Sequence, residues 1–191
     1  MAEGRRLFLA GGLKAMSLSQ LTSAAGIAKT SFYALFPSKE ALLLDLLHQE
    51  APGVDARVMS KLADFKMSAR DALVAFLTAL LHEYASNPFL ARLVAEPDVL
   101  TAIRRRVRPE DIEQKAIWMQ RPITSFFERR ILSGEIEKLE QSVLLDLVRS
   151  VSLLSLHRDR FETPERFEAV SKHLIQFVAD GLLNRENHND H

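Results

Sequence analysis

Apolar side chains recur along this chain at the spacing of a helix, and no stretch shows the alternation of a strand. Phe32 and Phe36, for example, are four residues apart. Longer stretches with helical spacing occupy residues 39–51, 54–65, 68–86, 109–132, 141–157 and 164–183. We therefore expect an all-α fold, and we find no internal repeat.

Two short helices are expected near the beginning of the chain. Ser17 and Gln20 have the spacing of a capping box, in which the serine side chain accepts a backbone N–H and the glutamine reaches back. Residues 26–28 then form a turn. The second short helix covers 29–36 and ends at Pro37, which cannot continue it.

Glycine and proline residues predict where other helices are interrupted. A first segment, about 5–10, should end at Gly11-Gly12. We expect Pro52-Gly53 to break or kink the helix that begins at 39, and residues 97–109 to form a connector.

The composition excludes several classes of function. The chain has 191 residues and a formal net charge of zero, so any anionic partner must be met by a local patch. It has no cysteine, which excludes disulfides and thiolate chemistry. We find no secretory signal and no run near the roughly 20 apolar residues of a membrane span, so we expect a cytoplasmic protein without a membrane partner. We also expect no cofactor, and no metal, because the six histidines show no ligand spacing.

Two short helices joined by a tight turn are typical of a helix-turn-helix unit, whose second helix enters the major groove of DNA. The polar residues of this stretch fit that role, because ammonium and hydroxyl groups can donate to phosphates or base edges. The residues that we expect to contact DNA are Ser17, Lys29, Thr30, Ser31, Tyr33 and Lys39. The spacing alone fits equally well a helical hairpin inside an all-helical core.

The residues around this turn resemble the TetR family of bacterial transcriptional regulators. The resemblance rests on Gly12, Leu21, Ala25-Gly26-Ile27, Phe32-Tyr33 and the run Phe36-Pro37-Ser38-Lys39-Glu40-Ala41-Leu42. It implies a homodimeric repressor that binds palindromic operator DNA through two such units and leaves it when a small-molecule effector binds to the C-terminal helices. It also implies, by position, the same DNA-contacting residues as those named above.

Two features depart from the pattern of the family. Where many members have an aromatic residue and then a histidine, this chain has Ala34 and Leu35, so a phosphate contact is missing. The first helix also has fewer turns before Leu7 and Phe8 than is usual. Either the start shown is late or the helix is truncated, and a truncated helix would brace the recognition helix less firmly.

The last two long helices are apolar over more than one face. One apolar face serves a helix's own core, and the surplus indicates a partner. The resemblance implies a four-helix interface between two copies of the chain. In it we place Leu147, Val151, Leu154, Phe167, Val170, Leu174, Phe177 and Gly181. The thoroughly buried core of a monomer would show the same surplus.

The resemblance also implies an effector pocket among the C-terminal helices. Its candidate residues are Tyr84, Phe89, Trp118, Met119, Phe126, Phe127 and His157. Their aromatic character suggests an effector that is at least partly apolar, although aromatic residues at helical spacing are also typical of plain core. We divide the chain into a DNA-binding domain, 1–47, with its motif at about 17–36, an effector-binding and dimerisation domain, 48–184, and a disordered tail, 185–191.

Two other classes of function compete with a regulator. An enzyme has little support, since the sequence has no glycine-rich phosphate loop, no GxSxG motif and no paired carboxylates with a histidine. A helical interaction protein that kept the fold and lost DNA binding would fit the neutral charge, the short first helix and Leu35.

Overall fold

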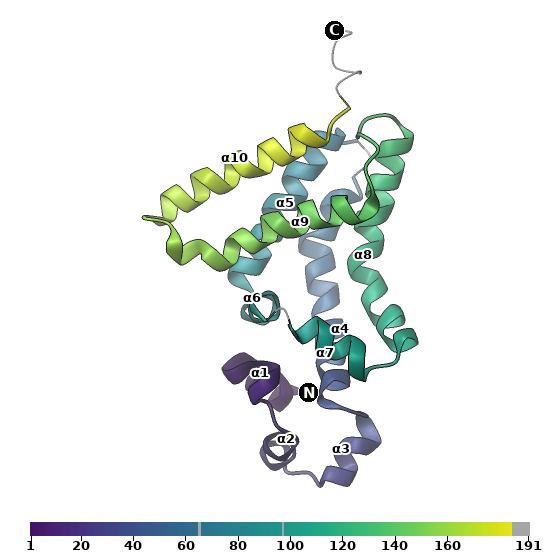
Figure 1. Ribbon diagram of the computed structural model, residues 1–191, viewed down its shortest axis with the longest axis vertical. Coiled ribbons are helices and arrows are strands. Elements are labelled where there is room, and N and C mark those ends of the chain that lie inside the picture. Colours follow the sequence, from purple (N-terminus) through teal and green to yellow (C-terminus); the bar gives the residue numbers. More distant parts are fainter. Residues whose placement is uncertain (65, 97, 185–191) are drawn as a thin grey trace. The chain divides into compact units, whose positions relative to one another are not determined.

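The computed structural model describes residues 1–64, 66–96 and 98–184, without the side chains of Val94, Glu113 and 115–120. Most of these residues are helical, which confirms the predicted all-α fold (Figure 1). The α-helices are α1 Ala2–Ala15, α2 Leu18–Ala25, α3 Lys29–Leu35, α4 Lys39–Arg57, α5 Ala69–Ser86, α6 Pro88–Ala95, α7 Asp98–Arg106, α8 Pro109–Leu132, α9 Gln141–Leu154 and α10 Pro164–Leu182. The 3-10 helices are η1 Met59–Leu62 and η2 Ser155–Arg160. The predicted tail, 185–191, lies outside the described residues.

The chain divides into two compact units. The first unit contains residues 1–52 and 87–118, and the second contains residues 53–86 and, among the described residues, 119–184. The segment 87–118, which the sequence analysis grouped with the C-terminal helices, is therefore compact with the first four helices. The predicted domains, 1–47 and 48–184, divide the chain by role rather than by compactness, and they stay a prediction.

In the first unit, α1 is held by an aromatic contact and an ion pair. The ring of Phe8 is fully buried, and its centre lies 5.0 Å from that of Phe89 in α6. Arg5 donates from Nη2 to Glu50 of α4 over 2.7 Å, and its guanidinium group lies over the ring of Phe89. Asn87 donates to the other carboxylate oxygen of Glu50. These contacts supply the tertiary support that a helix of this length needs in water.

Gly12 produces a kink within α1. Its φ of 70° and ψ of −176° belong to a region of backbone conformation that essentially only glycine occupies. Helical structure continues beyond it to Ala15, and the N–H of Met16 donates to the carbonyl of Gly12 over 3.1 Å. The helix end that we predicted at Gly11-Gly12 is thus a kink inside a longer helix.

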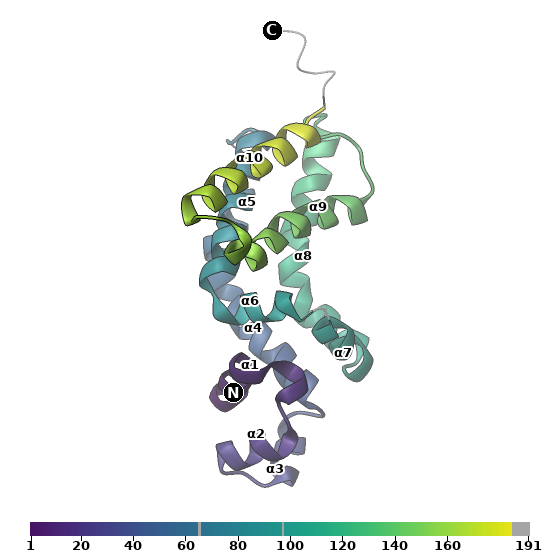
Figure 2. The same ribbon diagram turned by 60° about the vertical axis from the view of Figure 1, so that its left-hand side comes forward.

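The second unit is built around α5, because α9 and α10 both pack against it and against each other (Figures 1 and 2). The buried residues of α5 include Ala72, Leu73, Phe76, Leu77 and Leu80, which recur at helical spacing. Those of α9 are Leu144, Val148, Val151 and Ser152, and those of α10 are Phe167, Ser171, Ile175, Ala179 and Leu182. These three helices therefore share one apolar core.

A polar cluster joins the start of α5 to the turn after α8. Glu135 accepts hydrogen bonds from Arg130 over 2.7 Å, from the hydroxyl of Ser133 over 2.9 Å and from the N–H of Ala69 over 3.1 Å. Burial by itself would raise the pKa of Glu135, but these hydrogen bonds outweigh it and lower the pKa below its ordinary value.

Two of the predicted interruptions leave the chain helical. Helix α4 continues through Pro52 and Gly53 to Arg57, so the predicted break was wrong, whereas the kink stays a prediction. Residues 98–106 form α7 instead of a connector. Val99 and Ile103, four residues apart, make its buried face, which the neighbouring arginines had hidden from the pattern.

Among the described residues, no helix combines the length and apolar character that a membrane span needs.

Candidate nucleic-acid interface

The first helix of the predicted motif begins at a complete capping box. The hydroxyl of Ser17 accepts from the N–H of Gln20 over 3.2 Å, and the N–H of Ser17 donates to the side-chain oxygen of Gln20 over 2.9 Å. Leu21 and Thr22 form the buried side of α2, and the hydroxyl of Thr22 donates to the carbonyl of Leu18 over 3.0 Å. This capping confirms the predicted start of the helix and satisfies N–H groups that would otherwise be unpaired.

The turn between the two helices depends on Gly26. Its φ of 64° places it in the left-handed region that closes a helix without strain only at glycine. The N–H of Ile27 donates back to the carbonyl of Thr22 over 3.0 Å, so the chain reverses within a few residues. Helix α3 can then begin at Lys29.

Helix α3 buries one side chain and exposes the residues that we expect to contact DNA. Phe32 is 3% exposed and anchors the helix, with the ring of Tyr33 packed edge-on at 5.7 Å. Lys29, Thr30 and Ser31 are exposed, and Tyr33 is 57% exposed. The structure therefore brings these four predicted residues together on the outward side of a seven-residue helix.

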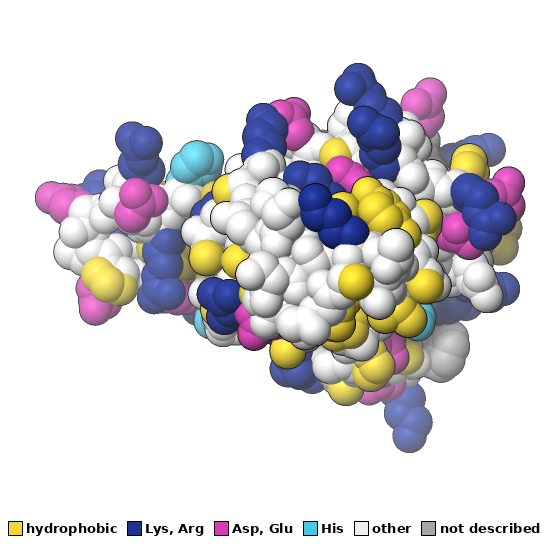
Figure 3. All heavy atoms as spheres, turned by 90° about the horizontal axis from the view of Figure 1, so that it is seen from below, with side chains coloured by type: hydrophobic (Ala, Val, Ile, Leu, Met, Phe, Trp, Pro, Cys, Tyr) yellow, Lys and Arg dark blue, Asp and Glu magenta, His cyan; other side chains and the backbone are white. Residues whose placement is uncertain are grey.

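Residues 17–36 carry very little charge. Lys29 is the one cation in this stretch, which contains no acid. Other cations of the first unit have partners within it: Arg5 pairs with Glu50, Arg6 with Glu3, and Lys14 with Asp98. Figure 3 agrees with this, since the basic side chains on the face that it shows are dispersed among acidic ones rather than gathered into a patch. Hydroxyl and backbone N–H groups must therefore supply most contacts to an anionic backbone.

Lys39 has a second role that the sequence did not indicate. Its ammonium group donates to the backbone carbonyls of Leu13 and Met16 over 2.7 and 3.0 Å. The side chain thus joins the start of α4 to the end of α1. One N–H of the ammonium group remains for the predicted phosphate contact.

Exposed apolar side chains flank the same surface. Leu35, at the end of α3, is 70% exposed, and Ile27 in the turn is 38% exposed. Leu35 stands where the TetR pattern has a histidine, so the outward side of α3 ends in a hydrocarbon group instead of a hydrogen-bond donor.

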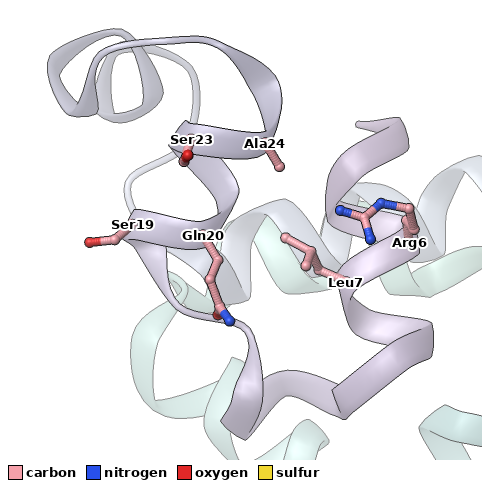
Figure 4. Close-up of a pocket in the computed structure, with 6 residues that line it drawn as sticks. All are labelled: Arg6, Leu7, Ser19, Gln20, Ser23 and Ala24. Carbon is pink, nitrogen blue, oxygen red and sulfur yellow. The ribbon is translucent and has the colours of Figure 1, made fainter.

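A hollow of about 500 Å³ lies between α1 and α2 (Figure 4). Leu7 of α1 points toward α2, where Gln20 and Ala24 lie opposite it, whereas Ser19 points away. Arg6 and Ser23 complete the lining. Ser19 and Ser23, four residues apart and exposed on α2, add two hydroxyls that the sequence analysis did not select, although their helical spacing was visible there.

The residues predicted for an effector pocket are divided between the two units. Phe89 is fully buried against Phe8 in the first unit, which corrects its assignment to a pocket of the C-terminal helices. Phe126 and Phe127 are almost fully buried in α8, with ring centres 5.6 Å apart. His157 is exposed in η2.

The remaining effector candidates are only partly described. Tyr84 is half-buried in α5, and burial raises the pKa of its hydroxyl. The side chains of Trp118 and Met119 lie outside the described residues. A second hollow of about 510 Å³ lies between Ser155 and Pro164, and neither hollow is lined by a predicted effector residue. The pocket therefore stays a prediction.

The residues predicted for a dimer interface separate into two groups. Val170 is 41% exposed and Phe177 is 71% exposed on the outward side of α10, where Leu174 is half-buried and Gly181 is exposed. On α9, Leu147 and Leu154 are half-buried. Val151 and Phe167 are each only 1% exposed, because they point into the core of their own unit, which corrects their assignment to the interface.

The described residues contain no cluster of three or more histidine or acidic side chains that could hold a metal ion. Their arrangement around α2 and α3 instead offers hydroxyls, one ammonium group and backbone N–H groups on an exposed surface. Such groups bind phosphate oxygens and base edges.

The beginning of the chain matches a known protein family, and longer stretches are similar to known regulators. Residues 1–46 match the family described as bacterial regulatory proteins, tetR family. An uncharacterised HTH-type transcriptional regulator of Mycobacterium tuberculosis is 25% identical over 162 residues, which cover 75% of this chain and 78% of that protein. The HTH-type transcriptional repressor NemR of Escherichia coli is 30% identical over 87 residues, covering 46% of this chain and 44% of NemR.

The fold is similar to that of a solved regulator structure. The crystal structure of a TetR family transcription regulator from Marinobacter aquaeolei VT8 superposes with a TM-score of 0.71, covering 96% of this chain and 93% of the other at 19% identity. At that identity the similarity shows a common fold.

Proposed function

The chain belongs to the TetR family of bacterial transcription regulators, and from this premise we propose that it is a repressor that binds a palindromic operator as a homodimer. Regulators of this family are transcription factors and not enzymes. A small molecule that binds the second unit would release the repressor from its operator.

The observation that carries this proposal is the outward side of α3. Phe32 fixes the helix from below, and Gly26 fixes its angle to α2, so that Lys29, Thr30 and Ser31 face solvent together. An α-helix that presents short polar side chains at its first turn can enter the major groove and read base edges. Ser17 and Tyr33 supply hydroxyls for phosphates on either side.

The outward side of α10 supports the homodimer. Val170, Leu174, Phe177 and Gly181 recur at helical spacing on this side, and Phe177 is largely exposed. A large exposed aromatic residue on a long helix is typical of a surface that a partner covers. Two copies related by a two-fold axis would bury the same stripe of each chain.

The effector proposal rests on the aromatic content of the second unit. Tyr84 and the buried pair Phe126 and Phe127 belong to two of its helices, α5 and α8. An apolar environment with a phenol hydroxyl suits a small molecule that is at least partly apolar. Differential scanning fluorimetry with a panel of apolar carboxylic acids, aromatics and quinones would show a binding class as a raised Tm.

A gel shift with the DNA that flanks the gene tests the proposed function. We expect a sequence-dependent shift that weakens at higher salt, and the triple variant Lys29→Ala, Thr30→Ala, Tyr33→Ala should abolish it. The matched control replaces Leu132, Lys138 and Ser142, exposed residues of the second unit, by alanine. Equal binding of every DNA fragment at low salt, or none by a folded dimer, would exclude a specific operator.

A specific observation also favours the second candidate, a helical interaction protein that has lost DNA binding. The stretch 17–36 offers a single cation, and Leu35 exposes hydrocarbon where a phosphate donor is usual. The two candidates differ in salt dependence. If Lys29 and Lys39 of both copies each neutralise one phosphate, the repressor should show a slope of log K against log salt of about −3.6, since each neutralised phosphate contributes about −0.9.

A further inference from the structure

The corner between α1 and α2, residues 12–17, is held from outside by two charged side chains. The N–H of Leu13 donates to Oε2 of Glu96 over 3.2 Å. The carbonyl of the same residue accepts from Lys39 over 2.7 Å. Leu13 thus has both of its peptide groups bound to side chains that lie far from it in the sequence.

Glu96 fits this corner closely. A Cβ atom on Gly12 would collide with the carboxylate of Glu96. The carboxylate therefore fits only because position 12 has no side chain. Nε of Arg92, one turn earlier in α6, lies 2.7 Å from the other carboxylate oxygen, as an ion pair. Position 12 therefore requires glycine for two reasons, because its φ of 70° also excludes most other residues.

The position of this corner affects the positions of α2 and α3, which carry most of the residues that we expect to contact DNA. It ends at Ser17, the N-cap of α2, and α2 leads through the Gly26 turn to α3. Leu13 and Met16 are 4% and 1% exposed, so a shift of this segment would move side chains in the core of the first unit. A change at Glu96 can thus alter the position of α2 without touching a residue that we expect to contact DNA.

Glu96 also lies at a special place along the chain. It ends α6 and precedes α7, within the segment 87–118 that belongs to the first unit. That segment is continuous at both ends with the second unit, through α5 before it and through α8 after it.

We propose that Glu96 is a positioning residue for DNA binding, whose carboxylate holds the α1–α2 corner in its operator-binding form. This inference rests on the proposed function. Lys39 secures the same corner from α4, so release of Glu96 alone would loosen the corner and not unfold it. A state with the corner released would bind operator more weakly.

Operator affinity and stability of the full-length protein, measured together, test the proposal. We expect Glu96→Ala to weaken operator binding about tenfold or more, a typical size of coupling between sites, with a thermal midpoint close to that of Glu110→Ala. Glu110 is the matched control, because it is an exposed carboxylate of the same unit in the first turn of α8. Glu96→Gln, which keeps an oxygen for the N–H of Leu13, should recover most of the affinity.

A merely structural role for Glu96 predicts a different result. Affinity would then fall only as far as the folded fraction falls, and Glu96→Gln would behave like Glu96→Ala. Either of these results overturns the proposal.

Amide hydrogen exchange in the absence of DNA separates this proposal from the proposed function. Faster exchange at Leu13 in Glu96→Ala, with unchanged exchange in the core of α5, supports the positioning contact even if the wild type binds no DNA fragment. Unchanged exchange at Leu13 overturns the contact, whatever the gel shift shows.

Discussion

Helices α3 and α10 expose opposite kinds of surface. Helix α3 has seven residues, buries Phe32 and presents Lys29 and hydroxyls to solvent. Helix α10 has 19 residues, buries a full apolar stripe and still exposes Val170 and Phe177. The first surface suits a hydrated, charged partner, and the second suits a surface like itself.

The exposure of a side chain does not by itself identify the partner that it contacts. Tyr33 and Phe177 are both largely exposed aromatic residues, at 57% and 71%. Tyr33 stands among hydroxyls with a polar end of its own, whereas Phe177 is four residues from His173, whose ring stacks on it, and three from Leu174. The neighbours of each residue, read along the helix, decide which class of partner it fits.

The largest expected effect comes from disrupting the exposed apolar surface of α10. Phe177→Asp places a carboxylate in the proposed interface, and we expect it to cost about 2–5 kcal/mol of dimerisation free energy, because a buried charge would lack a partner. The protein should elute as a monomer in size-exclusion chromatography with light scattering, and operator binding should fall steeply because one unit makes few contacts.

The control for this change is Ala169→Asp, which adds the same charge at another exposed position of α10. It should leave the dimer intact. A dimer that survives Phe177→Asp would place the interface elsewhere.

The next effect removes charge from α3. Lys29→Ala should weaken operator binding about tenfold, and it should reduce the salt slope by about two for a dimer, because each lysine neutralises one phosphate. Fluorescence anisotropy over a range of salt concentrations measures both quantities. Lys138→Ala, an exposed lysine of the second unit, is the control and should leave both unchanged. A slope unaffected by Lys29→Ala would remove Lys29 from the interface.

A smaller effect is expected from adding a positive charge at the end of α3. Leu35→Arg restores a phosphate donor at the end of α3, so we expect about three- to tenfold tighter DNA binding and a salt slope that is steeper by about two for a dimer. Leu132→Arg is the matched control, because Leu132 is 87% exposed in the second unit. Equal gains from both arginines would indicate non-specific attraction and not a groove contact.

The smallest expected effect is on the stability of the second unit. We expect it to leave the exposed surfaces of α3 and α10 unchanged. Because the pKa of Glu135 is lowered in the folded protein, its contribution to stability is present at neutral pH and is lost as the pH falls through that lowered pKa. Glu135→Gln should cost about 1 kcal/mol at neutral pH, after allowance for solvent screening, and nothing in acid.

Urea unfolding at several pH values measures this difference. Glu137→Gln is the control, since Glu137 is exposed in the same turn. A difference between wild type and Glu135→Gln that stays constant with pH would show that the carboxylate does not act through its charge.

Some features were predictable because their signals are local. Ser17 and Gln20 are three residues apart, and Gly26 follows the last residue of α2 directly, so the caps of the helix-turn-helix could be read from neighbouring letters. Phe32 lies within α3 itself, and its burial follows from helical spacing. The residues predicted for DNA contact are brought together for the same reason, since all but Ser17 and Lys39 share one short helix.

Other features depend on residues that are distant in the sequence. Phe89 looked like a pocket residue until its ring was placed against Phe8, and Val151 and Phe167 shared the apolar spacing of an interface while pointing into their own core. Periodicity gives the angle of a side chain around its helix, but it does not say which side another helix covers.

The sequence by itself determined that this protein is all-α, where its helix-turn-helix begins and turns, and which family it resembles, because caps, turns and helical spacing act over a few residues. Only the tertiary structure decided that Lys39 and Glu96 hold the two peptide groups of Leu13. Leu13 and Glu96 are 83 positions apart, and no local pattern relates them. Their contact exists because folding places the end of α6 beside the kink at Gly12, where the missing side chain leaves room for a carboxylate.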